Sequence, residues 1–288
     1  MVTQSTCLQA LADAQSLGLE RLDAQLLLLH ALGKTGDASA GRAWLLARDT
    51  DELSDAITRQ FRALSLRRAA GEPLAYIVGS KEFFGLALQV DARVLVPRPD
   101  TETLVQWSLD LLQLPGTAQV PHILDLGTGS GAIALALAHQ LQAAGRQGQV
   151  VAVDASADAL DVARANAGRL GLQVQFMQSH WLQEVSGNFH LIASNPPYIA
   201  SADPHLAALR HEPLQALTAG ADGLDDLRQI IEQAPRCLRP GGWLLLEHGY
   251  DQAASVLALL ARRGFLQLQS RRDLAGIERC SGGQWPIA

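Results

Sequence analysis

The sequence predicts an α/β protein in which a small all-α domain and a β-hairpin precede a doubly wound, largely parallel sheet. Three observations support this prediction: leucines with helical spacing near the start, strand-like segments over 76–96, and alternating strands and helices from about residue 100 onward. Such alternation is typical of parallel βαβ units. We therefore expect a helical domain over 1–70, a β-hairpin linker over 71–97 and an α/β domain over 98–288.

The first seventy residues should be helical. Apolar residues recur at i, i+4 and i+7, the spacing of one helix face, in two sets: Leu22, Leu26 and Leu29, then Ile57, Phe61 and Leu64. The segment 33–41 between the sets is rich in Gly, Ser and Thr, which indicates a loop. Gly71-Glu72-Pro73 then ends the pattern, because a proline disfavours helix at the residue before it.

The linker should contain a β-hairpin. Its expected strands are 76–78 and 86–90, and the segment between them begins and ends with glycine. A third short apolar stretch, 94–96, stops at a proline.

The α/β domain should alternate strands with helices. We expect strands at 123–126, 150–153, 174–177, 191–193 and 243–246, and helices at 132–141, 157–170 and 227–238. In open sheets of this type, ligands bind at the carboxyl ends of the parallel strands. Residues that directly follow these strands are therefore the first candidates for a functional site.

Composition argues against several classes of protein. The net charge is −6, and only two of the 23 basic residues are lysines, so tight non-specific binding to nucleic acid is disfavoured. Three widely spaced cysteines form no CxxC pair, which indicates a reducing compartment and argues against a disulfide framework or a zinc site. No signal-peptide pattern occurs, and no apolar run approaches the roughly 20 residues of a membrane span. We expect a cytoplasmic protein without a membrane partner or a metal.

A glycine-rich loop follows the first strand of the α/β domain, and it consists of Gly127, Thr128, Gly129, Ser130 and Gly131. Glycines allow a tight turn and a close approach of a ligand to backbone N–H groups at a helix N-terminus. The spacing G-x-G-x-G is one residue shorter than the dinucleotide fingerprint G-x-G-x-x-G. A turn without a ligand would use the same glycines, so the loop alone leaves both interpretations open.

Asp154 strengthens the ligand interpretation, because it ends the second strand at the same edge of the sheet. A carboxylate at this position can accept hydrogen bonds from both ribose hydroxyls of a nucleoside. The alternative is that Asp154 caps the helix that begins near Ala157, a role for which Ser156 competes.

Asn195, Pro196, Pro197 and Tyr198 follow the fourth strand at this same edge. Two consecutive prolines remove two N–H donors and leave carbonyl acceptors on a stiff backbone. The Asn195 side chain adds another acceptor, and Tyr198 adds an aromatic face. Such a site can hold a planar NH₂ group by its two hydrogens and leave the nitrogen open to a methyl donor. A simple Pro-Pro turn is the alternative interpretation.

The glycine loop, the acidic strand end and the Asn-Pro-Pro-Tyr segment together resemble class I S-adenosylmethionine-dependent methyltransferases that modify planar nitrogens. Further strings narrow the resemblance to the release factor glutamine methyltransferases, the HemK/PrmC family: Gly71-Glu72-Pro73, Glu82-Phe83-Phe84-Gly85, Val96-Pro97-Arg98-Pro99-Asp100-Thr101-Glu102, Glu212-Pro213 and Leu246-Glu247-His248-Gly249. The resemblance runs from about Arg21 to Arg279. Two alternatives stay open: a glutamine methyltransferase of a ribosomal protein, and an adenine-N6 methyltransferase of nucleic acid.

The resemblance implies a Rossmann-like fold whose last strand, expected around 277–282, runs antiparallel to its neighbours. It implies S-adenosyl-L-methionine as cofactor and class-1 peptide chain release factors as protein substrates. The methyl group would go to the side-chain amide nitrogen (N5) of the glutamine in their Gly-Gly-Gln motif. The helical domain over 1–70 would recognise this substrate, and no direct contact with nucleic acid is expected.

The resemblance also implies roles for individual residues. The cofactor would be bound by Gly127, Thr128, Gly129, Ser130, Gly131, Asp154 and Asn195, with Trp181 packed on the adenine. The catalytic residues, which would also hold the glutamine, would be Asn195, Pro196, Pro197 and Tyr198. The family commonly has Asp before this tryptophan; here the residue is His180, a departure that affects the polar contact to the adenine edge. The site wall would be ordered by Asp100, Thr101 and Glu102, with capping of the next helix as the alternative for the first two.

Near the C-terminus, Gly282-Gly283-Gln284 repeats the acceptor sequence of the family's substrates. With an antiparallel last strand, this segment would lie at the sheet edge opposite the glycine loop. We therefore expect that Gln284 is not methylated by its own molecule.

Overall fold

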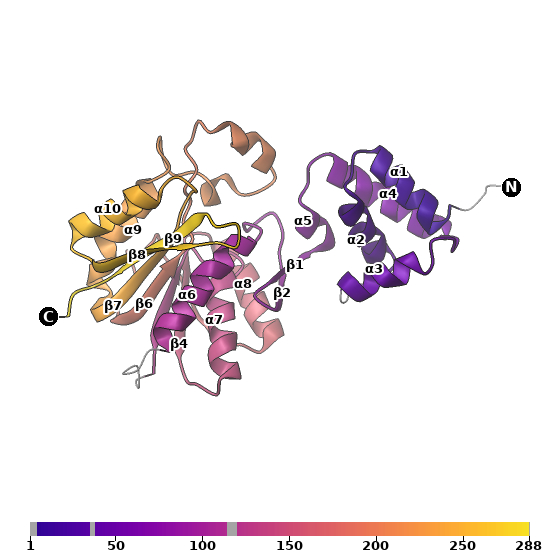
Figure 1. Ribbon diagram of the computed structural model, residues 1–288. Coiled ribbons are helices and arrows are strands. Elements are labelled where there is room, and N and C mark those ends of the chain that lie inside the picture. The colour runs from indigo at the N-terminus through magenta and orange to yellow at the C-terminus, as the bar shows by residue number, and fades with distance from the viewer. Residues whose placement is uncertain (1–4, 35–37, 114–119, 288) are drawn as a thin grey trace. The chain divides into compact units, whose positions relative to one another are not determined.

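Figure 1 shows the fold as a computed structural model, which describes residues 5–34, 38–113 and 120–287. The chain divides into two compact units, Met1–Ser80 and Lys81–Ala288. This division falls inside the segment 71–97. Each unit has its own buried apolar clusters.

The first unit is helical, as predicted. Its helices are α1 (Cys7–Ser16), α2 (Arg21–Ala31), α3 (Ala38–Leu46), α4 (Asp55–Ala69) and α5 (Leu74–Val78). Both helices predicted from apolar spacing are confirmed as α2 and α4, but the buried face of α2 differs. Leu27 and Leu28 are fully buried whereas Leu22 is 46% exposed. Because α2 contacts α1, α3, α4 and α5, more than one of its faces is covered.

The prediction of a strand at 76–78 is wrong, because these residues belong to helix α5. This helix begins after Pro73 and ends at Gly79, whose φ of 75° is left-handed. Ile77 is buried in the helical core of the first unit. β-Branched residues favour strands only weakly, and burial against helices outweighs that preference here.

A hairpin does form, slightly later in the chain. β1 (Ser80–Phe83) and β2 (Leu86–Gln89) make a two-stranded sheet. Both turn residues, Phe84 and Gly85, have positive φ, 48° and 80°. Positive φ at both positions matches the twist of the strands in a two-residue hairpin. Residues 94–96 are loop that leads into the 3₁₀ helix η1 (Pro99–Thr101).

The second unit contains a seven-stranded sheet with the order β5-β4-β3-β6-β7-β9-β8. Strands β3 to β7 are parallel, whereas β9 is antiparallel to both β7 and β8. Their bounds are β3 (His122–Leu126), β4 (Gln149–Asp154), β5 (Gln175–Gln178), β6 (Phe189–Ser194), β7 (Leu238–Glu247), β8 (Leu266–Arg272) and β9 (Glu278–Gln284). The predicted doubly wound sheet with an antiparallel last strand is confirmed.

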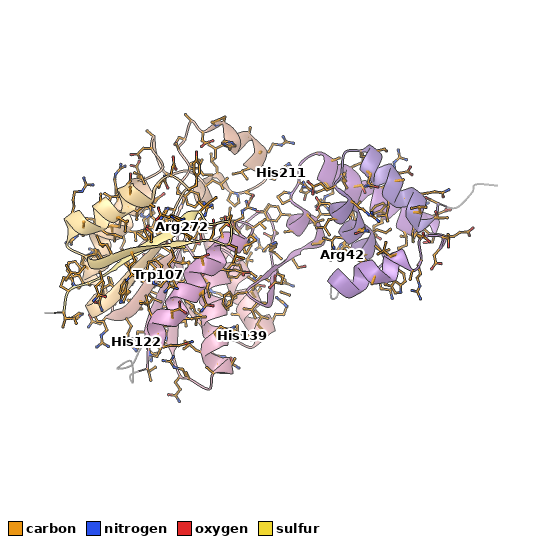
Figure 2. The ribbon with its side chains drawn as sticks, viewed as in Figure 1. Arg42, Trp107, His122, His139, His211 and Arg272 are labelled. Atoms are coloured by element: carbon orange, nitrogen blue, oxygen red, sulfur yellow. The ribbon has the colours of Figure 1, made fainter. Side chains whose placement is uncertain are left out.

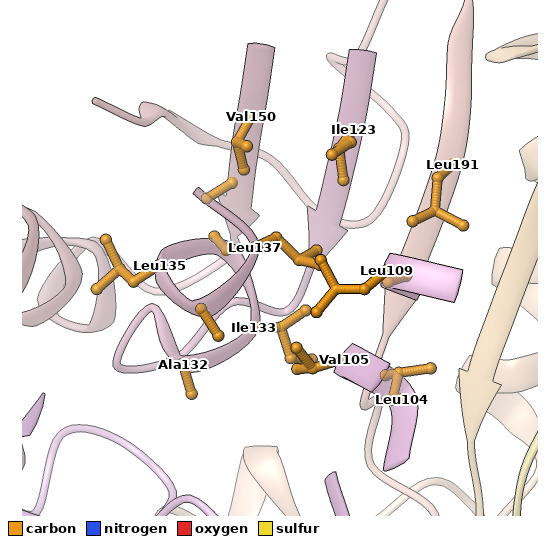
Figure 3. Close-up of a cluster of buried hydrophobic side chains, with 14 of the residues drawn as sticks. Leu104, Val105, Leu109, Ile123, Ala132, Ile133, Leu135, Leu137, Val150 and Leu191 are labelled. Carbon is orange, nitrogen blue, oxygen red and sulfur yellow. The ribbon is translucent and has the colours of Figure 1, made fainter. Parts of the chain in front are cut away.

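Helices cover both faces of this sheet (Figure 1). One face carries α6 (Glu102–Leu112), α7 (Ala132–Ala143) and α8 (Ala157–Leu170), and the other carries α9 (Asp225–Gln233) and α10 (Ala253–Arg263). In Figure 3, side chains of α6 and α7 meet those of β3, β4 and β6 in the first of these two cores. Trp107 of α6 (Figure 2) meets Trp243 of β7 edge-on, with ring centroids 6.3 Å apart. Because both faces are covered, the central parallel strands β3, β6 and β7 have mostly buried apolar residues.

The helix predicted over 227–238 is shorter than expected. α9 ends at Gln233, the 3₁₀ helix η4 (Ala234–Arg236) follows, and β7 begins at Leu238. Pro235 lacks the backbone N–H that a continued helix would need. β7 also begins earlier than the strand predicted at 243–246.

The end of β9 settles the position of the internal Gly-Gly-Gln sequence. Gln284 pairs with Trp243, whereas Cys280 pairs with Glu247 at the carboxyl end of β7. Gln284 thus lies toward the opposite edge of the sheet, as predicted. Its side-chain amide donates a 2.9 Å hydrogen bond to the carbonyl of Gly241.

Two further findings concern only the described parts of the chain. No helix there is long and apolar enough to cross a membrane. No group of three or more His, Cys, Asp or Glu side chains there could hold a metal ion.

Candidate functional site

A cavity of about 430 Å³ lies at the carboxyl edge of the parallel strands. Its wall combines residues that follow four strands: the glycine loop after β3, Asp154 at the end of β4, Trp181 after β5, and Asn195 with Pro197 after β6. The remaining sides come from the segments 93–95 and 213–216 and from α9. A cavity of this size suits a small organic ligand.

The glycine loop presents bare backbone to the cavity. Gly127 and Gly129 line it, with φ of 71° and 54°. A Cβ at Gly127 would lie 3.3 Å from the ring of Trp181, so a side chain there would crowd the cavity wall. The three other loop residues do not line the cavity but shape the loop; they are Thr128, Ser130 and Gly131.

Asp125, within β3, holds the loop from behind. Its Oδ2 accepts hydrogen bonds from Thr128 Oγ1 (2.7 Å) and from the backbone N–H of Ala134 (3.1 Å). Burial raises the pKa of Asp125 to about 7. The sequence motifs give this residue no role, although an acid inside an apolar strand is a usable signal.

Asp154 fixes the loop from the front. Its Oδ2 accepts from the N–H of Gly129 and its Oδ1 from the N–H of Ser156, both at 2.9 Å. The Ser156 hydroxyl is the one that caps α8, by accepting from the N–H of Ala159, so the capping interpretation of Asp154 is wrong. Burial, the largest effect, raises the pKa of Asp154, and the backbone N–H donors oppose it.

Trp181 is held in an uncommon backbone conformation, with φ of 50°. Its indole Nε1 donates to Asp226 Oδ1 of α9 at 3.0 Å, and both residues line the cavity. Burial raises the pKa of Asp226 above its usual value, although the hydrogen bond from the indole partly opposes this rise. Asp226 carries no motif that would have revealed it, because its position depends on how α9 packs. His180 also lines the cavity, and its ring lies 3.3 Å from the amide of Gln229.

The Asn-Pro-Pro-Tyr segment is anchored at both ends. Asn195 Nδ2 donates to Thr101 Oγ1 at 3.1 Å. The carbonyl of Tyr198 accepts from Gln252 Nε2 at 3.1 Å. Burial, and then the charge of Glu247, raises the pKa of the Tyr198 phenol to about 12. The phenol therefore stays protonated at neutral pH.

Residues 96–102 do not line the cavity, but the segment is tied to Asn195 and to Glu212 by hydrogen bonds. The N–H of Val96 and the guanidinium of Arg98 both bind the carboxylate of Glu212. Asp100 pairs with Arg279 of β9 at 3.4 Å. Thr101 is the N-cap residue of α6 by position, but its hydroxyl bonds to Asn195 rather than to the helix.

Glu247, at the carboxyl end of β7, is fully buried. Among the described residues, neither carboxylate oxygen has a hydrogen bond of normal geometry. The Thr101 hydroxyl is nevertheless close enough to lower its pKa, and so are the charges of Arg279 and Arg98. Burial outweighs these effects and raises the pKa of Glu247 from 4.5 to about 7.

The chain is similar to known methyltransferases over most of its length. The PrmC N-terminal domain matches residues 5–79, and a methyltransferase domain matches residues 121–268. The release factor glutamine methyltransferase of Bordetella pertussis is 49% identical, over 92% of this chain and 95% of that protein. The protein of the same name from Burkholderia pseudomallei is 47% identical, over 93% of each. Among solved structures, the hMettl16 catalytic domain in complex with MAT2A 3'UTR hairpin 1 aligns with a TM-score of 0.56 at 16% identity, over 85% of each chain, a similarity of fold alone.

The raised pKa of Glu247 predicts a stability that depends on pH. Between pH 4.5 and about 7 the folded chain binds more protons here than the unfolded chain, so the free energy of unfolding falls as pH rises. The loss is on the order of 3 kcal/mol. Glu247→Gln should therefore stabilise the protein at pH 8 and change little below pH 4.5. Urea unfolding at both pH values measures this, with Glu278→Gln on the exposed end of β9 as control. An equal effect at both pH values would show that Glu247 is not a buried, titrating acid.

Proposed function

The chain belongs to the release factor glutamine methyltransferase family, and we propose that it methylates the glutamine of the Gly-Gly-Gln motif in class-1 peptide chain release factors. The methyl group would move from S-adenosyl-L-methionine to the side-chain amide nitrogen, N5. The observation that carries the proposal is the place of Asn195, which lines the same cavity as the glycine loop and Asp154. An acceptor amide bound at Asn195 would thus lie beside a bound nucleoside cofactor.

The residues around the cavity suit this cofactor, which supplies a methyl group on a positively charged sulfur. Asp154 would accept hydrogen bonds from the ribose hydroxyls, because each carboxylate oxygen keeps a lone pair after binding one backbone N–H. The ring of Trp181, fixed by Asp226, would cover the adenine. Gly127 and Gly129 leave room for close approach, and Thr128, Ser130 and Gly131 would act by holding the loop. Asn195 would border both ligands.

The side-chain amide of glutamine is a poor nucleophile, because its nitrogen lone pair is delocalised into the carbonyl. The enzyme would therefore act through orientation. Asn195 Oδ1 and the Pro196 carbonyl would accept the two amide hydrogens, and Pro197 and Tyr198 would hold the plane of the amide. Alignment of this kind lowers a barrier by several kcal/mol, and by roughly 7–11 in ideal cases. The methylated nitrogen is acidic, so it loses its extra proton to water without a dedicated base.

The test of this function is methyl transfer from labelled S-adenosylmethionine. We expect label on a class-1 release factor and none on a variant whose Gly-Gly-Gln glutamine is alanine. A ribosomal protein and nucleic acid are the competing acceptors. Label on either of these, with none on the release factor, would replace the proposed substrate with that one.

Gln284 is a poor candidate for self-methylation. It lies toward the opposite edge of the sheet, and its amide is bonded to Gly241 and Gln267. The Gly-Gly-Gln of this chain is then a strand sequence, in which glycines fit because added Cβ atoms would meet Leu245 and Leu268.

Asp154→Ala should weaken cofactor binding by about 1.5–3 kcal/mol, the contribution of hydrogen bonds to a charged group. Titration calorimetry with S-adenosylmethionine measures the loss. Ser156→Ala is the matched control, because it removes the cap of α8 and keeps the carboxylate. Equal affinity losses in the two variants would mean that Asp154 only supports the local backbone.

Asn195→Ala should lower kcat by roughly 10²–10³ while cofactor affinity stays nearly constant, by analogy with loss of one preorganised polar group at a reacting centre. Tyr198→Ala should mainly raise KM for the release factor, because it removes a contact surface for the amide. Steady-state kinetics and thermal melts separate these effects. Unfolding of Asn195→Ala would make its role structural and contradict the mechanism.

The helical unit is proposed to recognise the release factor and to carry no chemistry, since every proposed site residue lies beyond Ser80. A protein that begins at Lys81 should bind S-adenosylmethionine with normal affinity, because the cavity is lined only by residues of the second unit. Its kcat/KM on an intact release factor should fall strongly. Undiminished kcat/KM would refute the recognition role.

A further inference from the structure

The hydrogen bond between Asn195 and Thr101 does not by itself fix which end of the Asn195 amide faces the acceptor. The C=O and NH₂ ends of an amide have nearly the same shape, and a hydroxyl can either donate or accept. The mechanism requires Oδ1 to face the acceptor, since only an oxygen can accept its amide hydrogens. Some other group must therefore determine the direction of the bond at 3.1 Å.

Glu247 is placed to determine that direction. Leu246 of β7 pairs with Ser194 of β6. Glu247 and Asn195 are the residues that follow this pair, so they leave neighbouring strands at the same level. Glu247 does not line the cavity as described, and it is fully buried. Neither carboxylate oxygen has a hydrogen bond of normal geometry among the described residues, and the Thr101 hydroxyl is the nearby donor that lowers its pKa.

An ionised carboxylate can only accept hydrogen bonds. If the Thr101 hydroxyl donates its one hydrogen bond to Glu247, the Thr101 oxygen can only accept a hydrogen bond from Asn195. Asn195 must then turn Nδ2 toward Thr101 and leave Oδ1 for the substrate. We propose that Thr101 and Glu247 form a positioning relay that fixes the orientation of the Asn195 amide for gripping the acceptor NH₂ group. This inference rests on the proposed function.

The relay gives a reason for a buried acid that otherwise only costs stability. Burying an ionised group without full hydrogen bonding is unfavourable, and an apolar residue at the end of β7 would avoid this. Glu247 does not contact the cavity, so it is a positioning residue rather than a catalytic one.

Protonation of Glu247 should release the constraint. A neutral carboxyl group can donate a hydrogen bond to the Thr101 oxygen. The Thr101 hydroxyl can then donate its own hydrogen bond to Oδ1 of a reversed Asn195 amide. The groups around Glu247 determine the pH at which it becomes protonated. They are Arg98 and Asp100 ahead of α6, Tyr198 after β6, Arg279 and Cys280 on β9, and His248 next along β7. The arginines favour the ionised form, whereas burial and Asp100 oppose it, so the pKa of Glu247 lies near 7. The productive orientation should therefore be lost as pH falls below about 7.

The experiment compares Thr101→Val, which keeps the shape of the side chain but removes the hydroxyl, with Thr101→Ser, which keeps the hydroxyl. We expect Thr101→Val to lower kcat about tenfold or more, with cofactor affinity unchanged. Thr101→Ser should recover most of that loss. Ser108→Ala is the matched control, because it removes another buried hydroxyl of α6, which bonds only within the helix.

Glu247→Gln tests the direction of the relay. Because a glutamine amide can donate as well as accept, both orientations of Asn195 become possible, and kcat should fall severalfold. The rise of kcat through about pH 7 in the unchanged protein should disappear. Thr101→Val with Glu247→Gln should be no slower than Thr101→Val alone, because the two residues act in one chain.

A second readout needs no turnover. In the full-length, ¹⁵N-labelled protein, the side-chain NH₂ signal that Asn195→Ala removes should shift with pH near 7, and should not shift in Glu247→Gln. A pH-independent signal in the unchanged protein, a kcat rise that survives in Glu247→Gln, or additive losses in the double variant would each overturn the relay. If the unchanged protein does not methylate a release factor but the Asn195 signal titrates as described, the proposed function fails and the relay stands.

Discussion

The hydrogen bond from Asn195 to Thr101 joins segments that are 94 positions apart in the chain, and the geometry of the candidate site depends on it. Thr101 has a fixed position because α6 follows directly and packs against β7 through Trp107. Asn195 is fixed from the other direction by the end of β6, by two prolines, and by the Gln252 contact to the Tyr198 carbonyl. A loop with few backbone donors of its own thus becomes stiff, and a stiff amide is what an orientation mechanism requires.

Two buried acids, Asp125 and Glu247, stand at the carboxyl ends of parallel strands on either side of this bond. Both have pKa values raised to about 7 by burial, so both weaken the fold at neutral pH relative to a neutral side chain. Asp125 holds the glycine loop through Thr128 and Ala134. Residues that cost stability yet order neighbouring loops are expected at functional sites rather than in a scaffold. This sheet edge therefore carries two acids that cost stability at neutral pH, as a functional site would.

Much of the fold followed from local sequence pattern, because apolar strands and glycine turns have short-range signals. The parallel strands, the glycine loop and the convergence of Asp154 with Asn195 are of this kind. Residues 76–78 were mispredicted, because a β-branched preference is weak and their partners lie in a helical core. The roles of Asp226 and Glu247 also escaped prediction from the residues themselves. Each role depends on the packing of elements distant in sequence, here of α9 on Trp181 and of α6 on β7.

The wall beside Trp181 shows how such packing can replace a missing sequence feature. The resemblance implies an acid before this tryptophan, where the chain has His180, yet a carboxylate lines the same cavity. It comes from α9, as Asp226, and it binds the indole Nε1 at 3.0 Å. That bond uses Oδ1, and a carboxylate offers about four acceptor positions in total. The same side chain can therefore orient the ring and keep an acceptor oxygen free, so this wall of the cavity has a carboxylate acceptor although residue 180 is histidine.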